Sequence, residues 1–165
     1  LKEIIISLIF TALIRTLIGL VPAIILTSPL FGISILELGL PLLLLFLSLY
    51  IFGITLGLFV SAGLIRFGPS FENIAWSSLF LLAPLGCIYY PLEILPSFFQ
   101  TIAKGLPLVY IFDETRNILL NGLVNYENLK QAYFLNFIYL ACGIGSFYLS
   151  FLKARIKGTL INMGE

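Results

Sequence analysis

Four apolar runs dominate the chain, and short polar stretches separate them. They cover Ile4 to about Leu26, Pro41 to about Ile65, Ile74 to Tyr90, and roughly Ala132 to Leu152. A helix needs about 20 predominantly apolar residues to cross a hydrocarbon core of ~30 Å, and these runs meet or approach that length. The pattern therefore predicts an all-α fold, a polytopic membrane helix bundle with four transmembrane helices.

Residues near the ends of two runs are typical of helix boundaries. Pro41 suits the first turn of a helix, where its missing N–H would have had no partner in any case. Asn125 is a candidate N-cap for the last span, and Gly158 follows that span.

The segment from about residue 91 to 122 differs from the spans on either side. Pro91, Pro96 and Pro107 interrupt any long helix, because each lacks a backbone donor. Its charges would be costly in hydrocarbon, yet it is too apolar for an ordinary soluble loop. Irregular backbone is tolerated at membrane depth where protein buries it or where it lines a wet cavity. We expect a short re-entrant helical hairpin here. An interfacial hairpin lying flat on the membrane and anchored by tyrosines fits equally well (Tyr89, Tyr90 and Tyr110).

Within this hairpin the prolines and glycines predict two short helices. The first runs from Ser97 to Lys104 and ends at Gly105, a position that favours left-handed geometry. The second runs from Ile111 to Asn121 and ends at Gly122. Asp113 and Arg116 are three residues apart, so they can form a local ion pair, whereas Glu114 and Arg116 cannot share a face.

Composition excludes several classes of protein. Of the 165 residues, 60% are hydrophobic and 10% are charged, and the mean hydropathy is +1.10. Globular domains carry roughly a quarter charged residues, so this composition argues against a soluble globular protein. A net charge of +1 provides no basic surface for nucleic acid. The chain has no histidine, and Cys87 and Cys142 fall in apolar spans, so we expect small buried apolar side chains rather than a metal or thiol site.

The first residue is Leu1 rather than Met, and no cleavable signal pattern follows it. We therefore expect residues 1–165 to form a single transmembrane domain that is an N-terminally truncated piece of a longer protein.

The distribution of basic residues predicts an orientation in the membrane. The clearest feature is the cluster Lys153, Arg155 and Lys157 directly after the last span. Basic residues are enriched in cytoplasmic loops. With both ends cytoplasmic, the inner segments also hold Lys2 and Arg66, while the outer segments hold Lys104, Arg116 and Lys130. The loop from Thr27 to Leu40, which has no Lys or Arg, then lies outside.

One charge falls inside a span. Arg15 lies near the middle of the first run, at helical spacing from small and polar residues such as Thr11 and Gly19. A central Arg costs roughly 2.5 to 3.5 kcal/mol, which the many apolar residues outweigh. We expect Arg15 to face protein or water. It either lines a substrate path or binds an anionic group, or it pairs with an acidic residue or carbonyl of another helix.

Small residues recur at four-residue spacing in two spans. In lipid, helices associate through close contact of such residues. The pattern predicts packing between helices of a bundle or a dimer at these positions: Gly53, Gly57 and Ser61 in the second span, and Ala141, Gly145 and Ser146 in the fourth.

The order of residues around the hairpin resembles a known family. The pairs Tyr90-Pro91 and Leu95-Pro96 are followed by Pro107, then Glu114-Thr115-Arg116, then the last span and its basic cluster. This order resembles the membrane-spanning subunits of type-2 ABC transporters, particularly bacterial drug- and lipid-export permeases, over residues 42 to 158.

The resemblance implies a six-span permease in the cell (plasma or inner) membrane that works as a homodimer or heterodimer. Its first two spans would precede this chain, and the hairpin would close the outer gate. A separate or fused partner ATPase would bind ATP and Mg²⁺, so this chain would bind no cofactor itself. No phosphate-binding loop ending in Gly-Lys-Ser/Thr occurs in the sequence.

Three functions remain open at this point. The first is export of a lipophilic or amphiphilic substrate by alternating access. The alternative is an ion-coupled secondary transporter, which places ionisable groups near the midplane; no Asp, Glu or His lies in the core of a span. An intramembrane enzyme could use Glu93, Asp113 and Glu114, but no nucleophile–base pair accompanies them.

Overall fold

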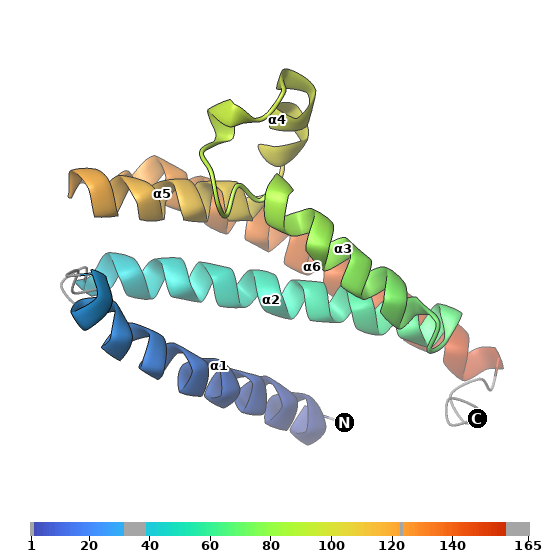
Figure 1. Ribbon diagram of the computed structural model, residues 1–165. Coiled ribbons are helices and arrows are strands. Elements are labelled where there is room, and N and C mark those ends of the chain that lie inside the picture. The colour runs from blue at the N-terminus through green and yellow to red at the C-terminus, as the bar shows by residue number, and fades with distance from the viewer. Residues whose placement is uncertain (1, 32–38, 123, 158–165) are drawn as a thin grey trace. The chain divides into compact units, whose positions relative to one another are not determined.

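The computed structural model describes residues 2–31, 39–122 and 124–157, and all regular structure in this part of the chain is helical. The helices are α1 (Lys2–Phe31), α2 (Gly39–Phe67), α3 (Phe71–Leu85), α4 (Ser97–Ala103), α5 (Pro107–Asn121) and α6 (Tyr126–Lys157), with a 3₁₀ turn, η2, at Leu92–Ile94 (Figure 1). The predicted all-α class is confirmed. Leu1, most of the loop predicted to lie outside, and Gly158 fall outside the described residues.

Three helices are long and apolar enough to cross a membrane. The candidate spans are Phe10–Thr27 in α1, Gly39–Phe67 in α2 and Tyr126–Ile156 in α6. The predicted number of four is not confirmed. The third run forms only the 15 residues of α3 and ends at Leu85 rather than Tyr90. At 1.5 Å per residue this helix is about 22 Å long, which is short of a ~30 Å core.

The chain divides into two compact units, residues 1–43 and 44–165. Helix α1 occupies most of the first unit. Among the side chains that the structure describes in its candidate span, Phe10–Thr27, none is buried. The remaining helices belong mainly to the second unit, which contains the predicted hairpin.

Helices α2 and α6 pack on each other and run in the same direction. The amide Nδ2 of Asn136 donates to the carbonyl oxygen of Ser48 at 2.8 Å. Seven residues further along each helix, a Cβ added at Gly143 would lie 3.5 Å from the Cγ2 atom of Thr55. Because the residue numbers rise together in both pairs, the helices are parallel, and the chain must return between them.

Helices α3 and α5 make this return in two steps. At the start of α3, a Cβ on Gly63 of α2 would overlap the ring of Phe71. At its end, a Cβ on Gly86 would lie 2.8 Å from the Cδ1 atom of Leu108, in the first turn of α5. The two helices therefore meet end to end. Residues 87–106, which we call the α4 loop, stand out from the side of the bundle at this junction (Figure 1).

Helix α5 packs against the N-terminal half of α6 in the opposite direction. The Tyr139 hydroxyl donates to the carbonyl oxygen of Gly105 at 3.1 Å. Further along α5, Glu114 accepts from Asn128 at 3.2 Å. The pairing moves toward the N-terminus of α6 as α5 proceeds, so the two helices are antiparallel. Helix α5 ends beside the N-terminus of α6.

Candidate functional site

The predicted hairpin, residues 91–122, contains η2, α4 and α5. Helix α4 covers Ser97–Ala103, with Pro96 as its N-cap, one residue shorter than predicted. Helix α5 begins at Pro107 rather than Ile111, because proline fits a first helical position. It ends as predicted at Gly122, which has a left-handed φ of 67°.

The expected left-handed conformation at Gly105 is wrong. Gly105 is not among the residues with positive φ. Instead, α4 ends in two backbone hydrogen bonds of the 3₁₀ type. The N–H groups of Gly105 and Leu106 donate to the carbonyl oxygens of Ile102 and Ala103 at 3.0 and 2.8 Å. Such bonds satisfy the last carbonyls of a helix without a left-handed residue.

The α4 loop folds around a small core of its own. Cys87, Ala103 and Val109 are buried there, and the motif residues Tyr90 and Leu95 pack against them. The predicted burial of Cys87 is therefore observed, whereas Cys142 on α6 is exposed within the chain. We conclude that the segment is a packed unit rather than an open loop.

Two of the three hairpin tyrosines bond within the protein. The Tyr90 hydroxyl donates to the carbonyl oxygen of Pro84 at 2.9 Å, and the Tyr110 hydroxyl donates to that of Lys104 at 3.1 Å. Tyr89, in contrast, is 80% exposed. Tyr90 and Tyr110 thus tie the ends of the α4 loop to its neighbours.

Glu114 of the predicted motif is the largest fully buried side chain in the described part of the chain, with 1% of its surface exposed. Its Oε1 atom accepts from the backbone N–H of Asn125 at 2.6 Å. Asn125 is the residue before α6, and its own Oδ1 atom accepts from the N–H of Glu127 at 3.0 Å, as expected for an N-cap.

This arrangement is a capping box divided between two helices. In the usual box, the third residue of a helix reaches back to the N–H of the N-cap. Here the third residue is Asn128, and Glu114 of α5 accepts from that N–H instead. The Asn128 side chain donates to the Glu114 carboxylate at 3.2 Å. A carboxylate at a helix N-terminus also interacts favourably with the helix dipole.

Asp113 and Arg116 extend the network toward the α4 loop. The Nδ2 atom of Asn128 also lies 3.3 Å from the Oδ2 atom of Asp113. Asp113 pairs with Arg116 at 3.6 Å, which confirms the predicted local ion pair. The Nη1 atom of Arg116 donates to the carbonyl oxygen of Cys87 at 2.8 Å. Arg116 therefore connects α5 to Cys87, two residues beyond the end of α3.

The backbone of Cys87 is in a strained conformation. Its φ is 54°, a left-handed value that residues with a Cβ rarely adopt. This geometry turns the chain away from α3, and the hydrogen bond from Arg116 holds its carbonyl. Of the motif residues, Glu114 thus bonds to the start of α6, and Arg116 bonds to the segment that follows α3. Together they fix α5 between these two helices.

A second polar cluster was not predicted. Asn136 of α6 and Ser48 of α2 are both buried, and the Nδ2 atom of Asn136 donates to the carbonyl and hydroxyl oxygens of Ser48. The Oδ1 atom of Asn136 is buried without a partner among the described residues. A sequence signal was present: Ser48 and Thr55, and likewise Asn136 and Gly143, are seven residues apart and so share a helix face.

The predicted helix-packing residues face away from the contact between α2 and α6. Gly53, Gly57 and Ala141 are exposed, and a Cβ at either glycine of α2, or at Gly145 of α6, would meet nothing within 4 Å. Ser61 and Ser146 are partly buried. These positions are open within the single chain, and their packing on another chain stays a prediction.

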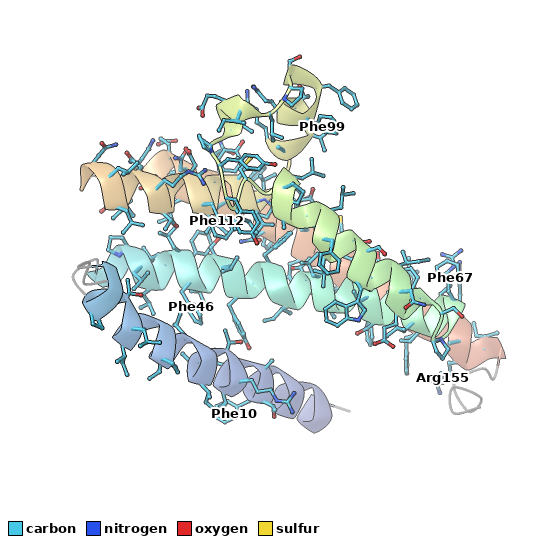
Figure 2. The ribbon with its side chains drawn as sticks, in the orientation of Figure 1. Phe10, Phe46, Phe67, Phe99, Phe112 and Arg155 are labelled. Carbon is cyan, nitrogen blue, oxygen red and sulfur yellow. The ribbon has the colours of Figure 1, made fainter. Side chains whose placement is uncertain are left out.

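The remaining predicted residues belong to α1 and to the last turns of α6. Arg15 is exposed on α1. In the last turns of α6, Lys153 and Arg155 are exposed, and Lys157 is the last residue of the helix (Figure 2). No group of three His, Cys, Asp or Glu side chains converges within the described ranges.

The network of Glu114, Asp113, Arg116 and Asn128 is thus a positioning device at the N-terminal end of α6. Comparison of the chain with protein-family models, curated proteins and solved structures gives no match. The geometry of the chain itself must support any proposed function.

Proposed function

We propose that the chain is the C-terminal part of a membrane-spanning permease subunit of an ATP-binding-cassette exporter. The permease moves a lipophilic or amphiphilic substrate across the membrane by alternating access. The observation that carries the proposal is the packed segment between α3 and α6. Helix α5, which begins at Pro107, is held there at the N-terminal end of α6 by the buried carboxylate of Glu114.

The proposal includes a position in the membrane. The protein is a multi-pass protein of the cell membrane whose C-terminus is cytoplasmic, and the basic residues Lys153 and Arg155 after the apolar part of α6 support this orientation. The N-terminus of α6 then faces outward. Helix α5 then reaches the outer end, and the α4 loop contacts α6 near its middle, at Tyr139. Both serve as the gate through which an exported molecule leaves.

The proposed partners follow from the same assignment. An ABC ATPase subunit, separate or fused, binds ATP and Mg²⁺ and drives closure, and a second permease subunit completes the pathway. The apolar surfaces of the described spans suit a lipid-linked or amphiphilic substrate better than a small ion. Within these spans, charged residues fall near the ends of α2 and α6, and Arg15 is the exception in α1.

The test uses the complete permease purified with its ATPase and reconstituted in vesicles. We expect amphiphilic substrates to stimulate ATP hydrolysis, and the Glu114→Ala variant to lose this stimulation while it retains basal hydrolysis. Leu120→Ala is the matched control, because Leu120 lies on the same helix and is 81% exposed. Stimulation by simple ions alone would contradict the proposal.

One observation favours an ion-coupled secondary transporter, the second candidate. The unpartnered Oδ1 atom of Asn136 is an acceptor buried inside the bundle. Transport that survives depletion of ATP but collapses with the ion gradient would support this candidate over the exporter.

A further inference from the structure

Helices α2 and α6 approach their C-terminal ends at the same level of the bundle. In the contact between them, Asn136 bonds to Ser48, and these residues are 88 positions apart in the chain. Because the two helices are parallel, the same offset places Arg66, in the last turn of α2, level with Ala154 of α6. Ala154 is buried, as expected for a residue on the packed side of α6. The last turns of both helices therefore share one end of the bundle.

Three basic side chains at this end have no acidic partner. Arg66 is exposed on α2, and Lys153 and Arg155 are exposed on α6. Within the part of the chain that the structure describes, none of the three forms an ion pair or a side-chain hydrogen bond. Near the N-terminus of α6, in contrast, Lys130 pairs with Glu127 at 2.7 Å. The negative ends of two helix dipoles favour cations here, but they leave the N–H donors of the arginines unused.

Exposed apolar side chains lie next to these cations. Phe67 is 63% exposed, and the guanidinium carbon of Arg66 lies 5.4 Å from the centre of its ring. The ring of Phe67 in turn stacks on that of Phe71 at 5.7 Å between centroids. Ile156, which follows Arg155, is 84% exposed. Figure 2 shows Phe67 and Arg155 at the same end of the bundle. The stacked rings support the guanidinium group and leave its charge in place.

The two arginines lie where two candidate membrane spans end. The spans are Gly39–Phe67 and Tyr126–Ile156, so Arg66 and Arg155 are each one residue from the end of a span. The headgroup region of a bilayer begins at this boundary. A soluble acidic protein would instead contact residues beyond the spans, and it would not need apolar side chains beside the cations. The position and the mixed chemistry of this surface therefore favour a phospholipid.

We propose that Arg66 and Arg155, together with Lys153, bind the phosphate of an anionic phospholipid headgroup at the end shared by α2 and α6. The planar guanidinium groups present N–H donors in a fork that matches phosphate oxygens. Phe67 and Ile156 contact the upper part of the acyl chains. A zwitterionic lipid binds less well, because the cation in its headgroup is repelled by the same side chains. This binding depends neither on the leaflet that the end faces nor on the proposed transport activity.

The test measures which lipid lies beside Ile156 in the full chain, reconstituted in mixed vesicles of phosphatidylglycerol and phosphatidylcholine. Trp76 is the chain's one tryptophan, so Trp76→Phe gives a silent background for an Ile156→Trp probe. Quenching by each lipid, brominated in the acyl chain near the headgroup, gives the ratio of their association at this position. We expect phosphatidylglycerol to be favoured at least about tenfold. Arg66→Gln and Arg155→Gln should each lower this ratio about fivefold, the contribution of one basic residue near anionic lipid.

Two controls separate this site from a general effect of charge. Lys130→Gln removes a cation of α6 that is paired with Glu127, and it should leave the ratio at the Ile156→Trp probe unchanged. A Phe134→Trp probe lies on the exposed side of α6 near its other end, and it should show a ratio near one. Circular dichroism should show an unchanged helix content in both arginine variants, since both side chains are exposed.

Three results would overturn the proposal. Equal quenching by the two lipids at the Ile156→Trp probe would leave the cations to an acidic protein partner. A preference that survives the combination of Arg66→Gln with Arg155→Gln would place the lipid site elsewhere. Inorganic phosphate should reduce the preference no more than chloride does at equal ionic strength, because both then only screen the charges. A larger effect of phosphate would identify free phosphate, rather than a lipid headgroup, as the ligand.

Discussion

The buried carboxylate of Glu114 accepts a hydrogen bond of 2.6 Å from the backbone N–H of Asn125, the N-cap residue of α6. The first N–H groups of a helix have no partner within it. A side chain from α5 therefore completes the start of α6. This bond makes the position of α5 and the start of α6 interdependent.

Loss of the Glu114 carboxylate should destabilise the fold. Glu114→Ala leaves a buried N–H without its acceptor, and we expect the free energy of unfolding to fall by about 2–3 kcal/mol. Glu114→Gln keeps one acceptor oxygen and should lose roughly 1 kcal/mol. Titration with a denaturing detergent, followed by circular dichroism, measures both changes. Leu120→Ala should stay within about 0.5 kcal/mol of the wild type. Equal stability of Glu114→Ala and the wild type would show that the bond contributes nothing.

The contact between Asn136 and Ser48 should couple α2 to α6. A double-mutant cycle of Asn136→Ala and Ser48→Ala isolates the bond between the two side chains, because the carbonyl oxygen of Ser48 is present in every variant. We expect a coupling energy of about 1 kcal/mol, since hydrogen bonds between membrane helices average somewhat below this value and reach about 1.7. In a control cycle of Asn136→Ala and Ile138→Ala, the two changes in the free energy of unfolding should add, because Ile138 is exposed. Additivity in both cycles would contradict the assigned contact.

The junction of α3 and α5 should tolerate no side chain at residue 86. A Cβ on Gly86 would lie 2.8 Å from the Cδ1 atom of Leu108 and 2.9 Å from the carbonyl oxygen of Leu82. We expect Gly86→Ala to destabilise the chain by about 1–3 kcal/mol in thermal unfolding, because the backbone atom cannot move aside easily. Gly57→Ala is the control, since no atom lies near its added Cβ. Alanine in a helix should stabilise that variant by up to about 1 kcal/mol. Equal effects at both glycines would rule out the close approach.

The open glycines of α2 test the predicted packing between chains. A Cβ added at Gly53 or Gly57 would have no atom within 4 Å, so we expect the fold to persist in the variant that combines Gly53→Leu with Gly57→Leu. If a second chain packs on this face, self-association measured by energy transfer in vesicles should weaken at least about tenfold, or 1.4 kcal/mol. Leu47→Ala, exposed on another side of α2, is the control and should leave association unchanged. Unaltered association in the glycine variant would remove this face from the interface.

The hairpin illustrates how far local sequence patterns reach. Pro96, Pro107 and Gly122 act on their own backbone, so the ends of the short helices could be predicted within a few residues. The pairing of Asp113 with Arg116 was also predictable, since it depends only on spacing along one helix. Gly105 was predicted wrongly, because two kinds of helix ending satisfy the same carbonyls and the sequence does not distinguish them.

The apolar runs by themselves determined that this is a helical protein with spans suited to a membrane, because length and hydropathy are properties of each segment alone. They also located the break at residues 91–122, since proline acts locally. Only the tertiary structure decided which residues bring the segments together. Gly86 meets Leu108, Glu114 completes the start of α6, and Asn136 bonds to Ser48, all across 11 to 88 residues of chain. These contacts depend on the direction in which each helix runs and on the face that it packs against its neighbour. Neither can be determined from the sequence of one segment alone.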